Sequence, residues 1–178
     1  MTTARVGLIV GHSLKDQGAV NKHSKVTEFA FNSEIVMGIA ERLAKLGLTP
    51  VVMYRTTYRQ LPHDVNTAGV DIAVSFHCNA FNERATGTEV LHLEGADKSK
   101  HLAECIQKEL LVALGLPNRG VKAIKSHDRG GNLLYKTAMP CVIAEPFFID
   151  NDQDLKLALT NKEKLIDAYV TGIYTAVS

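Results

Sequence analysis

The chain has 178 residues, a formal net charge of +1 and an ordinary composition, with 46% hydrophobic and 22% charged residues. A chain of this length can bury a full core, so we expect one globular domain over residues 1–178. No run of Lys or Arg concentrates positive charge, which argues against nucleic-acid binding. No apolar stretch approaches the roughly 18 residues of a membrane span, and the run before Gly11 is too short for a signal peptide. We therefore expect no membrane insertion, and synthesis in the cytoplasm without an export signal.

The first two expected elements are a buried strand and an amphipathic helix. Residues 6–10 form a short apolar run that ends at Gly11-His12, which is typical of a strand buried on both faces. After a polar loop, Thr27 can cap a helix, and Gly47 follows the end of that helix. Apolar residues at steps of four, four, four and three indicate the helix: Phe31, Ile35, Ile39, Leu43 and Leu46.

Strands and helices also alternate in the middle of the chain. Residues 48–54, 71–76 and 87–93 have the apolar patterns of strands. Residues 60–69 predict a weak helix or a loop. Asp97–Leu114 predicts a helix, because apolar residues recur every four positions and the following Gly-Leu-Pro sequence ends it.

The last third of the chain contains a polar stretch between two predicted elements. Residues 117–132 are rich in turn-forming residues, and we expect a long loop there, which in a compact domain is often functional. Cys141–Glu145 predicts a short buried strand, and Asn161 is expected to cap a last helix. Gly130-Gly131 shows no strand-to-helix setting, which argues against a phosphate-binding loop. The alternation as a whole predicts an α/β fold with a mainly parallel, twisted sheet and helices on both faces.

Candidate chemical groups stand where the predicted strands end. His12 and His77 each follow a strand, Glu145 ends another, and Glu28 begins the first helix. In open α/β sheets, ligands bind beyond the carboxyl ends of the strands, so these four side chains are candidates for one site. Two histidines and one carboxylate make a zinc site with an open fourth position, and a further carboxylate can act as acid and base. We therefore expect His12, Glu28 and His77 to bind one Zn²⁺ and Glu145 to be catalytic.

Each of these residues also has a plain structural interpretation. A lone histidine after a strand is more often a polar loop residue than a ligand. Glu28 would by itself be favourable in the first turn of a helix, because of the helix dipole. Glu145 is the most unusual of the four, since a carboxylate directly after Val142-Ile143-Ala144 costs free energy unless it is paired or lies in a cleft. Only the combination at one sheet edge favours a site.

The order of five motifs resembles the zinc-dependent N-acetylmuramoyl-L-alanine amidases of bacterial cell-wall hydrolases and phage endolysins. Four of the motifs are a Gly-His pair after the first strand, Gly-Ala-Val in the first loop, an Asp-apolar-Ser-x-His-x-Asn-Ala segment and an Arg-Gly-Val-Lys loop. The fifth is a closing segment that contains a Glu. In this chain they stand at residues 11–12, 18–20, 71–80, 119–122 and 140–151, and residues 87–90 match the family's strand after the third motif.

The resemblance implies hydrolysis of the amide bond between N-acetylmuramic acid and L-alanine in peptidoglycan. It assigns zinc to the same three ligands and the catalytic role to Glu145. Glu34 is a rival for Glu28, which we prefer because it lies four residues before Asn32 and 19 before the helix-ending glycine, as the family's ligand does. Candidate substrate-binding residues are Asn79, close after the His77 strand, and Arg129, in the polar stretch.

The chain departs from the family pattern at three places, and two other functions stay open. Ser13 follows Gly-His where many members have Gly-Gly, residues 61–64 lack an Arg that the family often has, and Pro146 follows Glu145. These differences bear on substrate contacts rather than on the metal site. The alternatives are a zinc peptidase that acts on stem peptides and a non-catalytic wall-binding module. Lack of an export signal would suit a phage lysin that reaches the wall after release, and it would equally suit a catalytic domain excised from a longer protein.

Overall fold

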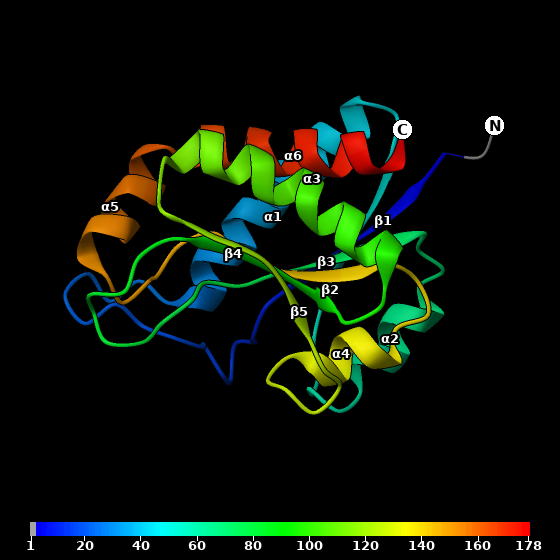
Figure 1. Ribbon diagram of the computed structural model, residues 1–178, viewed down its shortest axis with the longest axis horizontal. Helices are drawn as coiled ribbons and strands as arrows, with labels where there is room; N and C mark the ends of the chain where they lie inside the picture. Colours follow the sequence, from blue (N-terminus) through cyan, green and yellow to red (C-terminus); the bar gives the residue numbers. More distant parts are fainter. Residues whose placement is uncertain (1–2) are drawn as a thin grey trace.

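The computed structural model describes residues 3–178 and shows one six-stranded sheet between two layers of helices (Figure 1). Met1 and Thr2, which the expected domain includes, lie outside the described residues. The strand order is β2-β1-β3-β6-β4-β5. The strands are β1 (Arg5–Val10), β2 (Thr49–Tyr54), β3 (Ile72–Phe76), β4 (Thr88–Leu93), β5 (Asn118–Ile124) and β6 (Cys141–Glu145).

The directions of the strands decide which residues meet at one edge. β2, β1, β3 and β6 are parallel to their neighbours, whereas β4 pairs with β6 in the antiparallel direction and with β5 in parallel. The carboxyl ends of β1, β3 and β6 therefore share an edge with the amino end of β4. The expected mainly parallel α/β fold is confirmed, with one antiparallel pairing inside it.

Helices cover both faces of the sheet, as expected (Figure 1). α1 (Glu28–Lys45), α3 (Asp97–Leu114) and α6 (Lys162–Val177) lie on one face, and α2 (Leu61–Thr67) and α4 (Gly131–Lys136) lie on the other. Each face of the sheet has its own hydrophobic core. Side chains of β1 alternate between them, with Leu8 in the core under α1, α3 and α6 and Ile9 in the core under α2 and α4. This explains why a strand buried on both faces has a continuous apolar sequence. None of the helices in residues 3–178 combines the length and apolar character needed to cross a membrane.

The first helix begins and ends where the sequence predicts. The Thr27 side chain accepts a hydrogen bond from the backbone N–H of Ala30, which caps the amino end of α1. Gly47 follows the helix with φ +85°, a left-handed conformation that suits glycine. Phe31, Ile35, Ile39 and Leu43 are buried against the sheet, whereas Leu46 is half exposed at the helix end. This orientation fixes the first turn of α1, with Glu28, at the sheet edge.

The expectation of a long loop over residues 117–132 is wrong. β5 occupies the first half of this stretch, and α4 begins at its end. β5 is an edge strand with one neighbour and incomplete burial, so polar residues and Gly120 at φ +93° are tolerated in it. Gly130-Gly131 does therefore connect a strand to a helix, contrary to expectation, although α4 has only six residues.

A second helix near the carboxyl end was not expected. α5 (Asp152–Thr160) is capped by Asn151, whose side chain accepts hydrogen bonds from the N–H groups of Gln153 and Asp154. α6 follows at once, and Asn161 stands at its N-cap position as predicted. The Asn161 side chain nevertheless donates to the carbonyl of Leu157, so it closes α5 rather than capping α6.

Candidate active site

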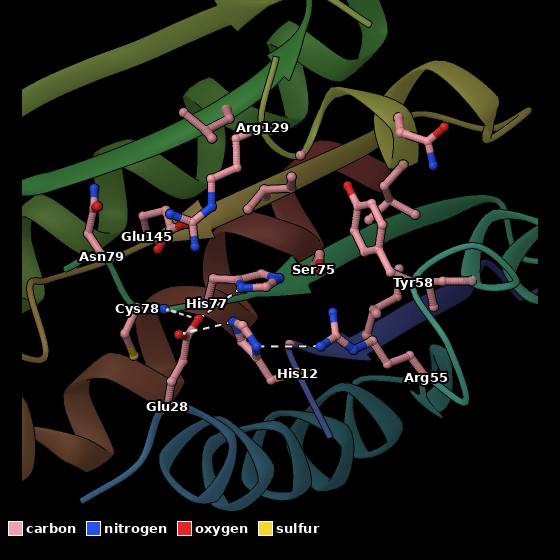
Figure 2. A pocket seen from close by; sticks show the side chains of 18 of the residues that line it. His12, Glu28, Arg55, Tyr58, Ser75, His77, Cys78, Asn79, Arg129 and Glu145 are labelled. Carbon is pink, nitrogen blue, oxygen red and sulfur yellow. Dashed lines mark hydrogen bonds and ion pairs between the residues drawn. The ribbon is translucent and has the colours of Figure 1, made fainter. Parts of the chain in front are cut away.

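A cleft of about 570 Å³ lies at the shared edge of β1, β3 and β6. Its floor contains the ends of these strands, and its walls come from the segment after β2, the start of β4 and residues 126–133. All six candidate residues from the sequence line this cleft: His12, Glu28, His77, Asn79, Arg129 and Glu145. Figure 2 shows His12, Glu28 and His77 gathered at its base.

Glu28 stands between the two histidines. Its Oε2 is 3.1 Å from His12 Nε2 and its Oε1 is 2.8 Å from His77 Nδ1. One donor atom from each of the three residues lies within 4.8 Å of the others, so the group could hold a metal ion. Glu34, the rival for Glu28, instead pairs with Lys162 on the surface of the helix layer. The structure thus brings the preferred set together.

The surrounding backbone orients the Glu28 carboxylate. The N–H of Ala19 donates to Oε2 at 3.1 Å, and the N–H of Cys78 donates to Oε1 at 3.0 Å. Glu28 is 3% exposed, and burial alone would raise the pKa of its carboxyl. Hydrogen bonds with His12 and His77 outweigh burial and hold that pKa far below its usual range. Glu28 is therefore ionised, and its hydrogen bonds fix the orientation of its carboxylate, as a metal ligand requires.

His12 is held from the side opposite Glu28. Its backbone has φ +67°, which turns the chain sharply after β1. Its Nδ1 is 3.4 Å from Asp16 Oδ2 and 3.5 Å from Arg55 Nη2, and Arg55 also pairs with Asp16. The Nε2 atom of His12 is the one that faces Glu28. Such outer contacts fix the orientation of a ligating imidazole.

Glu145 occupies the end of β6, beside the three-residue cluster (Figure 2). Its Oε2 is buried and has no hydrogen-bond partner among the described residues. Burial is the main cause that raises the pKa of Glu145 well above its usual range, and the carboxylates of Glu28 and Glu89 raise it further. The positive charge of Arg129 opposes this effect. A buried carboxyl with a free oxygen in a cleft is a candidate proton carrier.

Glu89, at the start of β4, also lines the cleft, and the sequence analysis assigned it no role. It stands directly across from Glu145 in the antiparallel β4–β6 register. Glu89 accepts hydrogen bonds from Asn79 Nδ2 at 2.7 Å and Arg119 Nε at 2.8 Å, and Lys122 Nζ is 2.7 Å away. Asn79 Oδ1 also accepts from its neighbour's N–H. Much of the Asn79 amide is thus used inside the protein, and one N–H and one lone pair remain for a ligand.

Arg55 and Tyr58 are two further cleft residues that the sequence analysis missed. A signal for Arg55 existed, because it directly follows β2, whose carboxyl end lies at the same edge as those of β1 and β3. Glu89 carried no such signal. Its position depends on the antiparallel direction of β4, which strand patterns do not reveal.

Comparison with known proteins gives a consistent result over nearly the whole chain. The family model of the N-acetylmuramoyl-L-alanine amidases matches residues 6–175. Three curated relatives come from Bacillus. The uncharacterized protein YqiI of Bacillus subtilis is 30% identical over 172 residues, or 92% of this chain and 80% of YqiI. The amidase LytC of the same species is 31% identical over 151 residues, or 81% of this chain and 29% of LytC.

The third relative, an uncharacterized cell wall amidase of Bacillus anthracis, is 41% identical over 96 residues, or 48% of this chain. The chain spans only 17% of the length of that relative. Among solved structures, the CwlD amidase of Clostridioides difficile, determined in complex with the GerS lipoprotein, has a TM-score of 0.86 and 26% identity. That match covers 98% of both chains. An amidase of Clostridium difficile 630 has a TM-score of 0.87 at 23% identity, which shows the shared fold.

Proposed function

Since the chain belongs to the N-acetylmuramoyl-L-alanine amidase family, we propose that it hydrolyses the amide bond between N-acetylmuramic acid and L-alanine in peptidoglycan, with zinc. The observation that carries the proposal is the pairing of a three-donor cluster with a free, buried carboxylate oxygen in one cleft. Amide hydrolysis needs a metal or other electrophile for the carbonyl and a group that moves a proton. The cleft supplies residues for both tasks.

The donor set fits zinc by its chemistry. Two imidazole nitrogens and one carboxylate oxygen are the ligands of a catalytic zinc with an open fourth position. His12 Nε2, His77 Nδ1 and a Glu28 oxygen would hold the ion, and the backbone N–H groups of Ala19 and Cys78 keep the carboxylate in place. A bound zinc ion would polarise the scissile carbonyl and make a water molecule acidic near neutral pH.

The chain's own residues then handle the proton and the substrate. Glu145 would take a proton from the attacking water on its free Oε2 and deliver it to the departing L-alanine nitrogen. Burial raises the pKa of Glu145 above its usual range, so its carboxylate is a stronger base toward water than that of an exposed glutamate. We propose that Arg129 and the remaining N–H of Asn79 contact the substrate from the cleft walls.

Digestion of purified peptidoglycan tests the proposed function. We expect the protein to release peptides with new L-alanine amino termini and to leave intact glycan, as read by mass spectrometry. We expect a chelator to abolish the release and added Zn²⁺ to restore it. Cleavage within the stem peptide would instead support a zinc peptidase. Zinc binding without cleavage of any wall type would support a non-catalytic wall-binding module.

The Gly18→Ala substitution tests how tightly the first loop encloses the metal ligands. An added Cβ would lie 2.6 Å from both Glu28 Oε2 and His12 Cδ2. We expect zinc affinity to fall by about tenfold or more, as when outer contacts of a ligand are disturbed. Isothermal titration calorimetry with Zn²⁺ measures the change.

Gly47→Ala is the matched control for that substitution. Gly18 and Gly47 have similar left-handed backbones, with φ +73° and +85°, but a Cβ at Gly47 would meet nothing within 4 Å. Both variants should lose about 1–2 kcal/mol of stability through backbone strain. Only Gly18→Ala should bind zinc more weakly, and equal zinc affinities in the two variants would contradict the prediction.

A further inference from the structure

Most of the charged side chains that line the cleft are paired inside the protein. Arg55 pairs with Asp16, and Glu89 is neutralised by Arg119 and Lys122. Asp128 lies 3.9 Å from the His127 ring. The cleft lining contains two arginines, and Arg129, unlike Arg55, forms no salt bridge among residues 3–178, although its charge acts on Glu145. A substrate group is thus free to bind it.

The backbone around Arg129 is held in a defined turn. Asp128 Oδ2 accepts from the N–H of Lys125 at 2.7 Å, and the N–H of Gly131 donates to the Asp128 carbonyl at 2.9 Å. Gly130 has φ +84°, and a Cβ there would lie 2.6 Å from Ile143 Cδ1, so the turn packs closely on β6. Figure 2 shows the Arg129 side chain directed into the cleft, toward Glu145. The guanidinium is therefore presented to whatever occupies the space beside Glu145.

The chemistry of the proposed substrate indicates which of its groups the Arg129 guanidinium can bind. In the intact substrate the lactyl carboxyl is consumed in the amide, so the sugar side of the scissile bond has no anionic group. The peptide side has one close by, because the glutamate after L-alanine is linked through its side chain and keeps its α-carboxylate. A guanidinium binds a carboxylate through two parallel hydrogen bonds, and it binds a carboxamide less well.

Resting on the proposed function, we propose that Arg129 binds the α-carboxylate of the second stem-peptide residue and makes the enzyme prefer peptidoglycan in which this group is not amidated. The carboxylate would lie on the side of the cleft formed by residues 126–133, with the sugar leading away from it. Because the contact forms in the bound substrate and in the transition state alike, it should act mainly on KM.

The test uses four synthetic N-acetylmuramoyl tripeptides with the zinc-loaded protein. The second residue carries either an α-carboxylate or an α-carboxamide, and the peptide end is either free or amidated. We expect wild type to show about tenfold lower KM for the α-carboxylate, the effect of one good ionic contact. Arg129→Gln should lose this difference in KM between the two substrates, and Arg129→Lys should keep part of it.

Lys164→Gln is the control, since it removes the same charge from an exposed position on α6. It should keep the wild-type preference. The inference would be overturned if Arg129→Gln kept the wild-type preference for the α-carboxylate. It would also be overturned if KM depended on whether the peptide end is free or amidated and not on the second residue. Binding of the tripeptides to zinc-loaded Glu145→Gln, with and without Arg129→Gln, gives a second measurement that does not need turnover. Wild type that cleaves neither the four tripeptides nor purified peptidoglycan would overturn the proposed function itself, which separates the two failures.

Discussion

Glu145→Gln is expected to lower kcat by about 10²–10⁴-fold, the usual contribution of a group that transfers protons in the transition state. Glutamine keeps the shape of the side chain but cannot take the proton from water or return it to the leaving nitrogen. Release of L-alanine amino termini from peptidoglycan, followed over time, measures the loss. Zinc content by atomic emission should stay at the wild-type level, because Glu145 is not in the three-donor cluster.

Stability distinguishes this loss from simple unfolding. Burial raises the pKa of Glu145, so the charged form is disfavoured at this position, and a neutral isostere should not lower the melting temperature of the metal-free protein. Glu104→Gln makes the same chemical change away from the cleft, in an exposed pair with Lys100 on α3, and should keep full activity. A Glu145→Gln variant with a near-normal rate would refute the role assigned to this residue.

His77→Ala is expected to abolish both zinc binding and activity. It leaves two of the three donors, and it removes one of the two imidazoles that neighbour the Glu28 carboxylate. For the wild type, zinc at about 100 times its Kd should add roughly 2.7 kcal/mol of stability, or about 5–10 °C in melting temperature. The variant should show no such rise, as measured by differential scanning calorimetry with and without Zn²⁺.

His63→Ala is the matched control, because His63 is an exposed histidine on α2 and does not line the cleft. It should keep the zinc-dependent rise and the activity. If His77→Ala retained a full equivalent of tightly bound zinc, the three-donor site would be wrong even though the family assignment stood. If it lost activity but kept the zinc-dependent rise, His77 would have a role other than that of ligand.

By itself the sequence determined the elements whose patterns are local. The four-residue steps of α1, its Thr27 cap and the ending Gly47 were predicted and confirmed, because they depend on contacts within a few residues. The strand ends that carry His12, His77 and Glu145 were also predictable. Parallel neighbours then brought these residues to one edge, as the alternation of strands and helices implied.

The tertiary structure alone decided the parts that depend on distant partners. β5 was mistaken for a loop, since an edge strand with partial burial lacks the apolar pattern that identifies a strand. The antiparallel direction of β4 places Glu89 across from Glu145, and the pairing of Arg55 with Asp16 supports His12 from 43 residues away in the chain. Such contacts join segments that are distant in the sequence, and no local pattern encodes the relative direction or spacing of these segments. The pairing of charged side chains in the cleft could therefore be established only from the folded chain.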